Sequence, residues 1–386
     1  MEQTIGNSSA ESPVVDAFYA KLNRKHLPSL DGLRGIAALL VVFYHFGIEF
    51  GFHPPPGYLG VLIFFVLSGF LITWLLLKES SATGTVSLSG FYLRRSLRIF
   101  PAFYGFWLFS IGVRILGHRT IAWGAAIASF FYVSNYYYSL VPGADTFMLH
   151  TWSLANEEQF YLLWPWVFKR AHNNLSRITV FLITAIALIW VYRPILKFLF
   201  HAPRNYLQYA FDCRVDALFA GCLLSILLKR KACDRFVATI CGRTYFSLLP
   251  VFLLVADTQI GDRLGPLYSQ IVGFPVEITC TVALLVQLIA FSESALWRWL
   301  NSRPAKFFGA ISYSLYLYQN ASFKFLPQPL RDIVVQGPIW GKVLGGLVLS
   351  IGVASLSYYV IEKFFLRLKD KLSIPKVAET APSTTS

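Results

Sequence analysis

Apolar runs of about twenty residues recur from residue 31 to residue 361, and short polar segments rich in lysine and arginine separate them. A helix needs about 20 apolar residues to cross the hydrocarbon core of a bilayer. The pattern therefore predicts an all-α integral membrane protein, a bundle of about ten transmembrane helices. The predicted spans lie near 31–50, 58–77, 100–117, 152–168, 178–196, 211–228, 244–258, 267–291, 307–323 and 338–360.

One more apolar run, IAWGAAIASFFYVSNYYYSL at 121–140, is long enough to span. Counting it as a span would move the basic cluster at 169–177 to the other side of the membrane. Tyrosine is enriched at the membrane–water interface, and this run is rich in it. We interpret it as a re-entrant or interfacial segment; alternatively, it spans and a neighbouring assignment is displaced.

The charge pattern explains an otherwise unusual composition. The chain has 386 residues, of which 55% are hydrophobic and 14% charged, and its formal net charge is +14. If the N-terminus is cytoplasmic, most of the 34 lysines and arginines fall in cytoplasmic segments, as the positive-inside rule requires. We therefore assign the positive charge to topology, with both termini cytoplasmic, and expect no nucleic-acid partner.

These assignments divide the chain into three parts. Residues 1–28 are predicted to form a cytoplasmic N-terminal tail, 29–365 the membrane domain, and 366–386 a cytoplasmic C-terminal tail that is partly disordered. The expected location is the cell inner (plasma) membrane, as a multi-pass protein. The five cysteines form no CxxC pair and show no metal-ligand spacing, so we predict neither a structural disulfide nor a metal site.

The first span carries two ionisable residues, Arg34 and His45, within LDGLRGIAALLVVFYHF at 30–46. Eleven residues of helix advance by about 1100° and rise about 16 Å, so both side chains share one face. Arg34 would lie at the cytoplasmic end, where Asp31 can pair with it. Arg34 as a snorkelling anchor and His45 as a hydrogen-bonding core residue both remain open. However, an ionisable residue inside a membrane indicates function, and imidazole transfers protons near neutral pH.

The LRGIAALLVVFYH block resembles the membrane acyltransferase-3 family, whose members transfer an acyl group, usually acetyl from acetyl-CoA, to an acceptor hydroxyl. The resemblance extends in order over nearly the whole membrane domain. The matching blocks are YLGVLIFFVLSGFLIT (58–73), FYLRRSLRIFPAFY (91–104), WSLANEEQFYLLWP (152–165), FFGAISYSLYLY (307–318) and YYVIEKFF (358–365). It implies an O-acyltransferase that uses acetyl-CoA or another acyl-CoA and acts on a carbohydrate or glycolipid acceptor.

The resemblance also implies which residues bind the donor. Arg95 and Arg98 stand at the mouth of the third span, and arginine's planar fork suits phosphate, although basic residues there are also expected from topology alone. With Arg34 they would hold the acyl-CoA. Its pantetheine arm is comparable in length to the offset between Arg34 and His45, which would bring the thioester near His45.

His45 would then act as the general base on the acceptor hydroxyl. Glu157 and Glu158 open the fourth span at its outer end, the level expected for His45, and one of them would orient the imidazole, with Glu158 slightly preferred. The alternative is an acidic pair at a helix N-terminus. Ser68 precedes a glycine, which favours helix packing over nucleophilic catalysis. Arg214 and Asp216 are interpreted as an ion pair or a contact to a polar acceptor.

Two departures from the family pattern qualify this interpretation. Gln319 stands where members often have histidine, and about 25 residues follow the last predicted span, whereas some members carry a fused extracytoplasmic domain. We therefore expect direct transfer or a separate partner. The alternative function is a membrane transporter or lipid-linked glycan flippase; a structural scaffold would leave His45 unexplained. The acceptor, the acyl chain length, an acyl-enzyme and the oligomeric state stay open.

Overall fold

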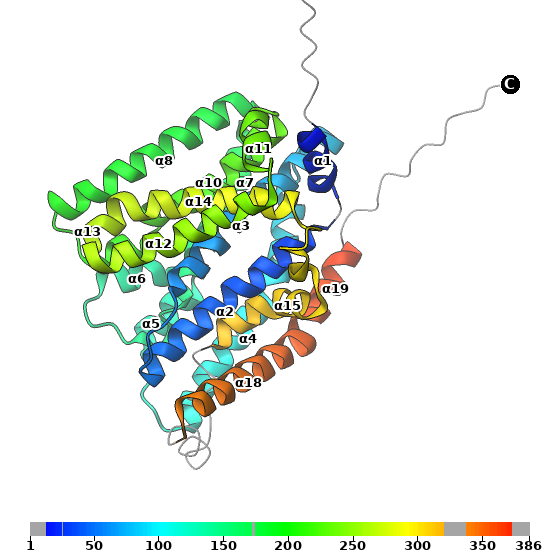
Figure 1. Cartoon of the computed structure of the whole chain (residues 1–386). Helices are drawn as coiled ribbons and strands as arrows, with labels where there is room; N and C mark the ends of the chain where they lie inside the picture. The colour runs from blue at the N-terminus through cyan, green and yellow to red at the C-terminus, as the bar shows by residue number, and fades with distance from the viewer. Residues whose placement is uncertain (1–12, 25, 172–173, 320–336, 373–386) are drawn as a thin grey trace, which may run out of the picture.

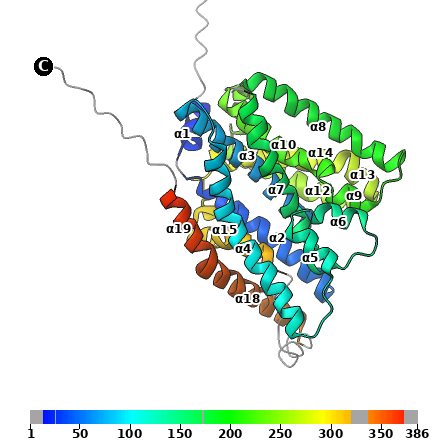
Figure 2. The same ribbon diagram turned by 180° about the vertical axis from the view of Figure 1, so that it is seen from behind.

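A computed structural model describes residues 13–24, 26–171, 174–319 and 337–372, and every regular element in these ranges is helical. Figure 1 shows the helices packed as one bundle, and Figure 2 shows it from behind, with α8 at one edge and α18 at the opposite edge. The longer helices are α2 (Pro28–Phe50), α3 (Gly57–Thr83), α4 (Leu88–Leu116), α7 (Thr151–Arg170), α8 (Leu175–Phe198), α10 (Phe211–Lys229), α12 (Leu248–Leu264), α14 (Phe274–Ala290), α15 (Arg303–Tyr318) and α18 (Ile339–Ser357). The shorter ones are α1 (Pro13–Leu22), α5 (Trp123–Phe130), α6 (Ser134–Leu140), η1 (Thr146–Met148), α9 (Arg204–Tyr209), α11 (Asp234–Ile240), η2 (Thr244–Ser247), α13 (Pro266–Tyr268), η3 (Ser269–Gly273), η4 (Arg298–Asn301), η5 (Tyr358–Glu362) and α19 (Lys363–Leu372).

Seven helical stretches in the described residues are long and apolar enough to cross a membrane, which confirms an all-α membrane protein. They contain α2, α3, α4, α8, α12, α14 and α18. Three more helices, α7, α10 and α15, occupy predicted spans but do not qualify by length and composition. α10 carries three charged residues in its first six positions, and α15 has 16 residues. A total of about ten spans therefore stays a prediction, as does the cytoplasmic side of the termini, although α1 and α19 lie at the same end of the bundle (Figure 1).

The 121–140 run is not one continuous helix. It forms the short helices α5 and α6, which are interrupted at Phe131–Val133, where Tyr132 has a positive φ of 53°. Helices of eight and seven residues are each too short to cross a bilayer. One continuous spanning helix over this run is therefore excluded.

The third predicted span begins earlier than its hydropathy suggests. α4 starts at Leu88, where the Ser87 hydroxyl accepts a hydrogen bond from the amide of Gly90 and caps the helix. Hydropathy alone placed the start near residue 100 because the intervening arginines lower the average. Arg95 and Arg98 consequently lie within the helix, about two to three turns from its start, rather than at its mouth.

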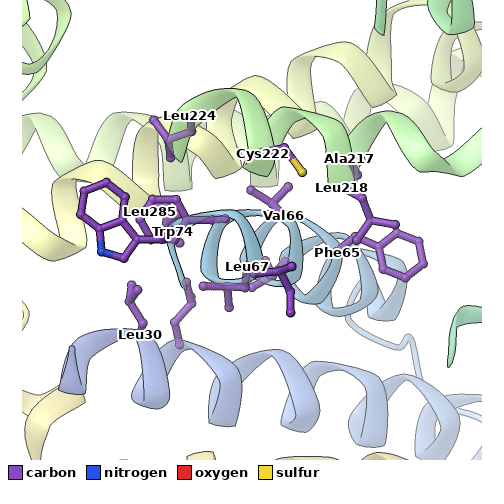
Figure 3. Packing of buried hydrophobic residues seen from close by; sticks show 14 of the residues in the cluster. Leu30, Phe65, Val66, Leu67, Trp74, Ala217, Leu218, Cys222, Leu224 and Leu285 are labelled. Carbon is purple, nitrogen blue, oxygen red and sulfur yellow. The ribbon is translucent and has the colours of Figure 1, made fainter. Parts of the chain in front are cut away.

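α3 is the central helix of the core. It is apolar on all faces, as expected for a helix that is buried all round. Figure 3 shows Val66 of α3 directed toward Cys222 of α10, and Leu67 on the opposite side, facing α2 and Leu30. The two central helices touch through glycines. A Cβ added at Gly69 would collide with the carbonyl of Leu218, and one added at Gly221 with the carbonyl of Val66.

A buried ion pair joins α8 and α10. The Arg193 guanidinium lies 2.6 Å from Asp216 Oδ2, and the indole of Trp190 donates to the same oxygen. Arg193 is fully buried. Arg214 instead lies over the ring of Phe274, with its guanidinium carbon 4.3 Å from the ring centroid. Of the two interpretations that the sequence left open for Arg214 and Asp216, the ion pair is corrected, because Asp216 forms its salt bridge with Arg193. The sequence predicts no structural disulfide, and in the structure all five cysteines are free thiols.

Candidate active site

A cavity of about 580 Å³ lies inside the bundle and is bounded by α2, α3, α4, α7, α15 and η5. Its walls are partly apolar, with Leu71 and Trp74 of α3 among them. Five of the six residues predicted to form the site line this cavity together: Arg34, Arg95, Arg98, Glu157 and Glu158. They come from three helices that are far apart in the sequence, so the fold assembles the site.

The arginine groups of α4 differ in their partners. Arg95 and Arg98 line the cavity, whereas Arg94 forms a salt bridge with Glu79 Oε2 at 2.9 Å and does not contribute to the lining. The Arg95 guanidinium carbon lies 5.2 Å from the ring centroid of Tyr161, a cation–π contact. Among neighbouring arginines, the structure therefore separates two that face the cavity from one that ties α3 to α4.

The two glutamates lie with the arginines rather than with His45, which corrects their expected level. Glu157 is close enough to Arg34, Arg95 and Arg98 for each to attract it electrostatically. Glu157 Oε1 also accepts a 2.7 Å hydrogen bond from the Ser68 hydroxyl. Glu158 lines the same cavity. Glu157 therefore has a hydrogen-bond partner on α3 at the wall of the cavity.

His45 does not line the cavity. Arg34 is the last residue of α2 that lines the cavity. His45 lies near the far end of the helix, with its Nδ1 2.8 Å from the carbonyl oxygen of Val41. α2 and α15 run side by side in the same direction. Two contacts along their length show this: Gly35 meets Gly309, and Val42 clusters with Leu315. The cavity extends along α15 to Tyr316. It thus ends about one helical turn short of the level of His45.

Asp31 does not pair with Arg34 as expected. Its Oδ2 lies 2.7 Å from His26 Nε2, at the end of the cavity where the chain enters α2. Other cationic residues at this end are Arg24, Lys78 and Lys306. Arg24 is itself 2.6 Å from Glu293 Oε1 and lowers the pKa of that carboxyl by hydrogen bonding and charge. The cavity mouth is therefore basic, and the three arginines lie deeper.

Glu362, which was not predicted from the sequence, is a buried carboxylate that lines the cavity from η5. The Ser314 hydroxyl of α15 donates to its Oε1 and is also hydrogen-bonded to the hydroxyl of Ser357. The signal was present, since Glu362 lies within the YYVIEKFF block, but that block gave no reason to single out the acidic residue. At the far end of the cavity, Tyr316 donates to the carbonyl of His150 at 2.8 Å. Among the described residues, no group of three or more histidine, cysteine, aspartate or glutamate side chains is placed to hold a metal ion.

The family model described as an acyltransferase domain matches residues 27–360. The chain belongs to the membrane acyltransferase-3 family. The match covers the cavity-lining helices α2, α3, α4, α7 and α15 and the first three residues of η5, so it includes the five predicted site residues that line the cavity.

Named relatives support the same family. The chain is 31% identical over 386 residues to the peptidoglycan O-acetyltransferase OatA of Listeria monocytogenes serovar 1/2a, covering 91% of this chain and 59% of the relative. It is 28% identical to the putative peptidoglycan O-acetyltransferase YrhL of Bacillus subtilis (90% and 56%) and 30% to the O-acetyltransferase OatA of Staphylococcus aureus (88% and 57%). The chain thus spans less than two thirds of the length of these relatives. No solved structure matches it.

Proposed function

We propose that this protein is an integral membrane O-acyltransferase that moves an acyl group, in the first instance acetyl, from a cytoplasmic acyl-CoA to a hydroxyl of a carbohydrate or glycolipid acceptor. The observation that carries the proposal is the meeting of three arginines and two glutamates in one cavity inside a bundle of apolar helices. Ionisable groups are costly within a membrane protein, so their concentration around an open space indicates chemistry or transport.

The basic residues support a phosphorylated donor. The mouth of the cavity carries Arg24, Lys78 and Lys306, and Arg34, Arg95 and Arg98 extend the positive charge inward. Guanidinium groups bind phosphates with paired hydrogen bonds, and the apolar wall of α3 suits an uncharged arm. An acyl-CoA has its phosphates at one end and its thioester at the other, so it would enter with the thioester leading.

The acceptor would approach from the opposite end. The cavity continues along α7 and α15 to Ser153 and Tyr316, toward the level of His45. His45 would take the proton of the acceptor hydroxyl there, and Glu157 would serve as a proton acceptor deeper in the cavity. Two of the relatives are named for peptidoglycan, which makes an exported glycan the first acceptor to test.

A turnover assay tests the proposal. Purified protein in liposomes would be supplied with acetyl-CoA and a crude extract of candidate glycans, and thioester consumption followed. The wild type is expected to turn over, and His45→Ala to be slower by about 10²- to 10⁴-fold, the usual contribution of a general base. Both proteins would first be shown to insert and fold alike.

Each outcome of this assay assigns the function differently. Equal rates for wild type and His45→Ala would retain the acyltransferase and remove His45 from its chemistry. No turnover, together with no binding of acetyl-CoA, would favour the transporter or lipid-linked glycan flippase, which would use the same polar cavity for binding alone.

Arg94 and Arg95 provide a matched test of donor binding. Arg95→Ala is expected to raise the KM for acetyl-CoA by about 10- to 100-fold, because a hydrogen bond to a charged group contributes about 1.5–3 kcal/mol. Arg94→Ala removes the same charge from the next residue, which pairs with Glu79 outside the cavity, and should leave KM within about twofold. Equal increases in both variants would show that only the general positive charge of this region matters.

A further inference from the structure

Ser68 lies in the middle of α3, with its hydroxyl held between two side chains of α7. Its Oγ donates to Glu157 Oε1 at 2.7 Å and accepts from the Tyr161 hydroxyl at 3.0 Å. All three residues line the cavity, so this hydrogen-bonded group faces open space. A serine that donates to a carboxylate at the wall of a cavity has the arrangement of an activated nucleophile.

Positive charge surrounds this group. The Arg95 guanidinium stacks on the ring of Tyr161, and Arg34 and Arg98 line the same cavity. Attack on a thioester creates an oxyanion, and preorganised donors in a site that excludes water stabilise such a charge strongly. The residues around Ser68 thus supply a nucleophile, a proton acceptor and cationic donors.

We propose that Ser68 is the covalent acyl carrier of this enzyme, accepting the acyl group from acyl-CoA and passing it to the acceptor hydroxyl. The inference rests on the proposed function and adds a residue and an intermediate to it. No base for Ser68 is visible in the sequence, which leaves an acyl-enzyme open. The fold places a carboxylate 2.7 Å from its hydroxyl, because α3 and α7 meet at this level.

The first half-reaction balances with the groups present. Ser68 Oγ attacks the thioester carbonyl carbon while its proton moves to Glu157 Oε1. The tetrahedral adduct collapses by breaking the C–S bond, and Glu157 returns the proton to the leaving sulfur. The products are an acyl ester of Ser68 and free CoA thiol.

The second half-reaction reverses the roles. A hydroxyl of the acceptor attacks the acyl carbon, and its proton passes to Glu157, directly or by way of His45. The bond between the acyl carbon and Ser68 Oγ breaks, and Glu157 returns the proton to Ser68 Oγ, which leaves the acylated acceptor and free Ser68. Because the CoA has departed, donor and acceptor need not occupy the cavity together. This suits a cavity in which the donor enters at the basic end and the acceptor at the end toward Tyr316.

A purely structural role for Ser68, as a tie between α3 and α7, is the competing explanation. The two helices have another polar contact, from the Trp164 indole to the Thr73 hydroxyl at 2.9 Å, and that contact is buried. Ser68 differs because it is only partly buried and lines the cavity. The two explanations also differ in what they predict without acceptor: an acyl carrier exchanges CoA and becomes acetylated, whereas a purely structural serine does neither.

The experiment measures exchange of labelled CoA into acetyl-CoA by the purified wild type without acceptor, and acid-stable label on the protein from acetyl-labelled acetyl-CoA. A carrier predicts exchange and an acetyl group on the peptide that contains Ser68. Ser68→Ala is expected to lose both, and at least about 100-fold of full transfer, while still binding acetyl-CoA. Ser68→Cys is expected to carry acetyl as a thioester that neutral hydroxylamine cleaves. Ser81→Ala, at an exposed position of the same helix, serves as the control.

The outcomes separate this inference from the proposed function. A wild type that completes transfer to the glycan yet shows no exchange and no label overturns the carrier and retains the acyltransferase. Full transfer by Ser68→Ala does the same. A wild type that neither binds acetyl-CoA nor consumes it overturns both. If Ser68 were only a tie, Ser68→Ala would lose activity but the wild type would show no exchange.

Discussion

Replacing Glu157 by glutamine is expected to lower acetyl transfer by about 10²- to 10⁴-fold, the range found when a positioned general base is removed. Glutamine keeps the size of the side chain and can still accept the hydrogen bond from Ser68, so the change removes the ability to take a proton rather than a contact. The loss should appear in kcat, with the Kd for acetyl-CoA nearly unchanged. Steady-state kinetics in liposomes and acetyl-CoA binding to the same preparation measure the two quantities.

Two further variants sharpen this result. Glu49→Gln changes an exposed glutamate on α2 and should leave the rate unchanged. Glu158→Gln, in the same cavity, should be less damaging than Glu157→Gln. A larger loss in Glu158→Gln would transfer the role to Glu158, as the order of preference from sequence had it. Unchanged activity in both cavity variants would contradict a carboxylate base.

The second large effect concerns assembly of the bundle. Gly221→Ala is expected to destabilise the protein by about 1–3 kcal/mol, the usual cost of overpacking a closely packed core. The added methyl group would meet the carbonyl of Val66 and lie 2.6 Å from the amide nitrogen of Phe70, and backbone atoms of a central helix cannot move aside locally. Thermal unfolding in detergent, followed by loss of the monodisperse peak in size-exclusion chromatography, measures the change.

Gly112 is the matched control for this substitution. It also lies inside a long helix, α4, but a Cβ there would have no atom within 4 Å. Gly112→Ala should therefore be neutral or stabilising by up to about 1 kcal/mol, since alanine is the better helix former. Equal unfolding temperatures for Gly221→Ala and wild type would show that α3 and α10 do not approach as closely as described.

Charges within apolar runs and local motifs account for what could be predicted of the site. Arg34 was found because charge inside an apolar run is costly and stands out in one dimension, whereas Arg95 and Arg98 were found through the resemblance of their block to the family. The predicted depth of each side chain in the membrane was less reliable. Glu157 was expected beside His45 because its span was taken to start at residue 152, but its level depends on how α7 packs against α3, which no single segment specifies.

The ion-pair and hydrogen-bond partners of the polar side chains were the least predictable feature of the structure. Asp31 and Asp216 were assigned to arginines close in sequence, yet they pair with His26 and Arg193. Likewise Ser68 had no visible base, and Glu362 had no visible neighbour, until distant helices were brought together. Apart from His26 with Asp31, these contacts join residues far apart in the chain, and a large separation in sequence carries no information about separation in space.

The sequence by itself determined that this is an all-α membrane protein of the acyltransferase family, because apolar length and local motifs are properties of contiguous residues. Only the tertiary structure decided that Arg34, Arg95, Arg98, Glu157 and Glu158 share a cavity, that His45 lies beyond it, and that Ser68 faces a carboxylate. The physical reason is packing. Helix contacts such as Gly69 with Leu218 set the depth and rotation of each helix, and small changes in either would place different side chains in the cavity.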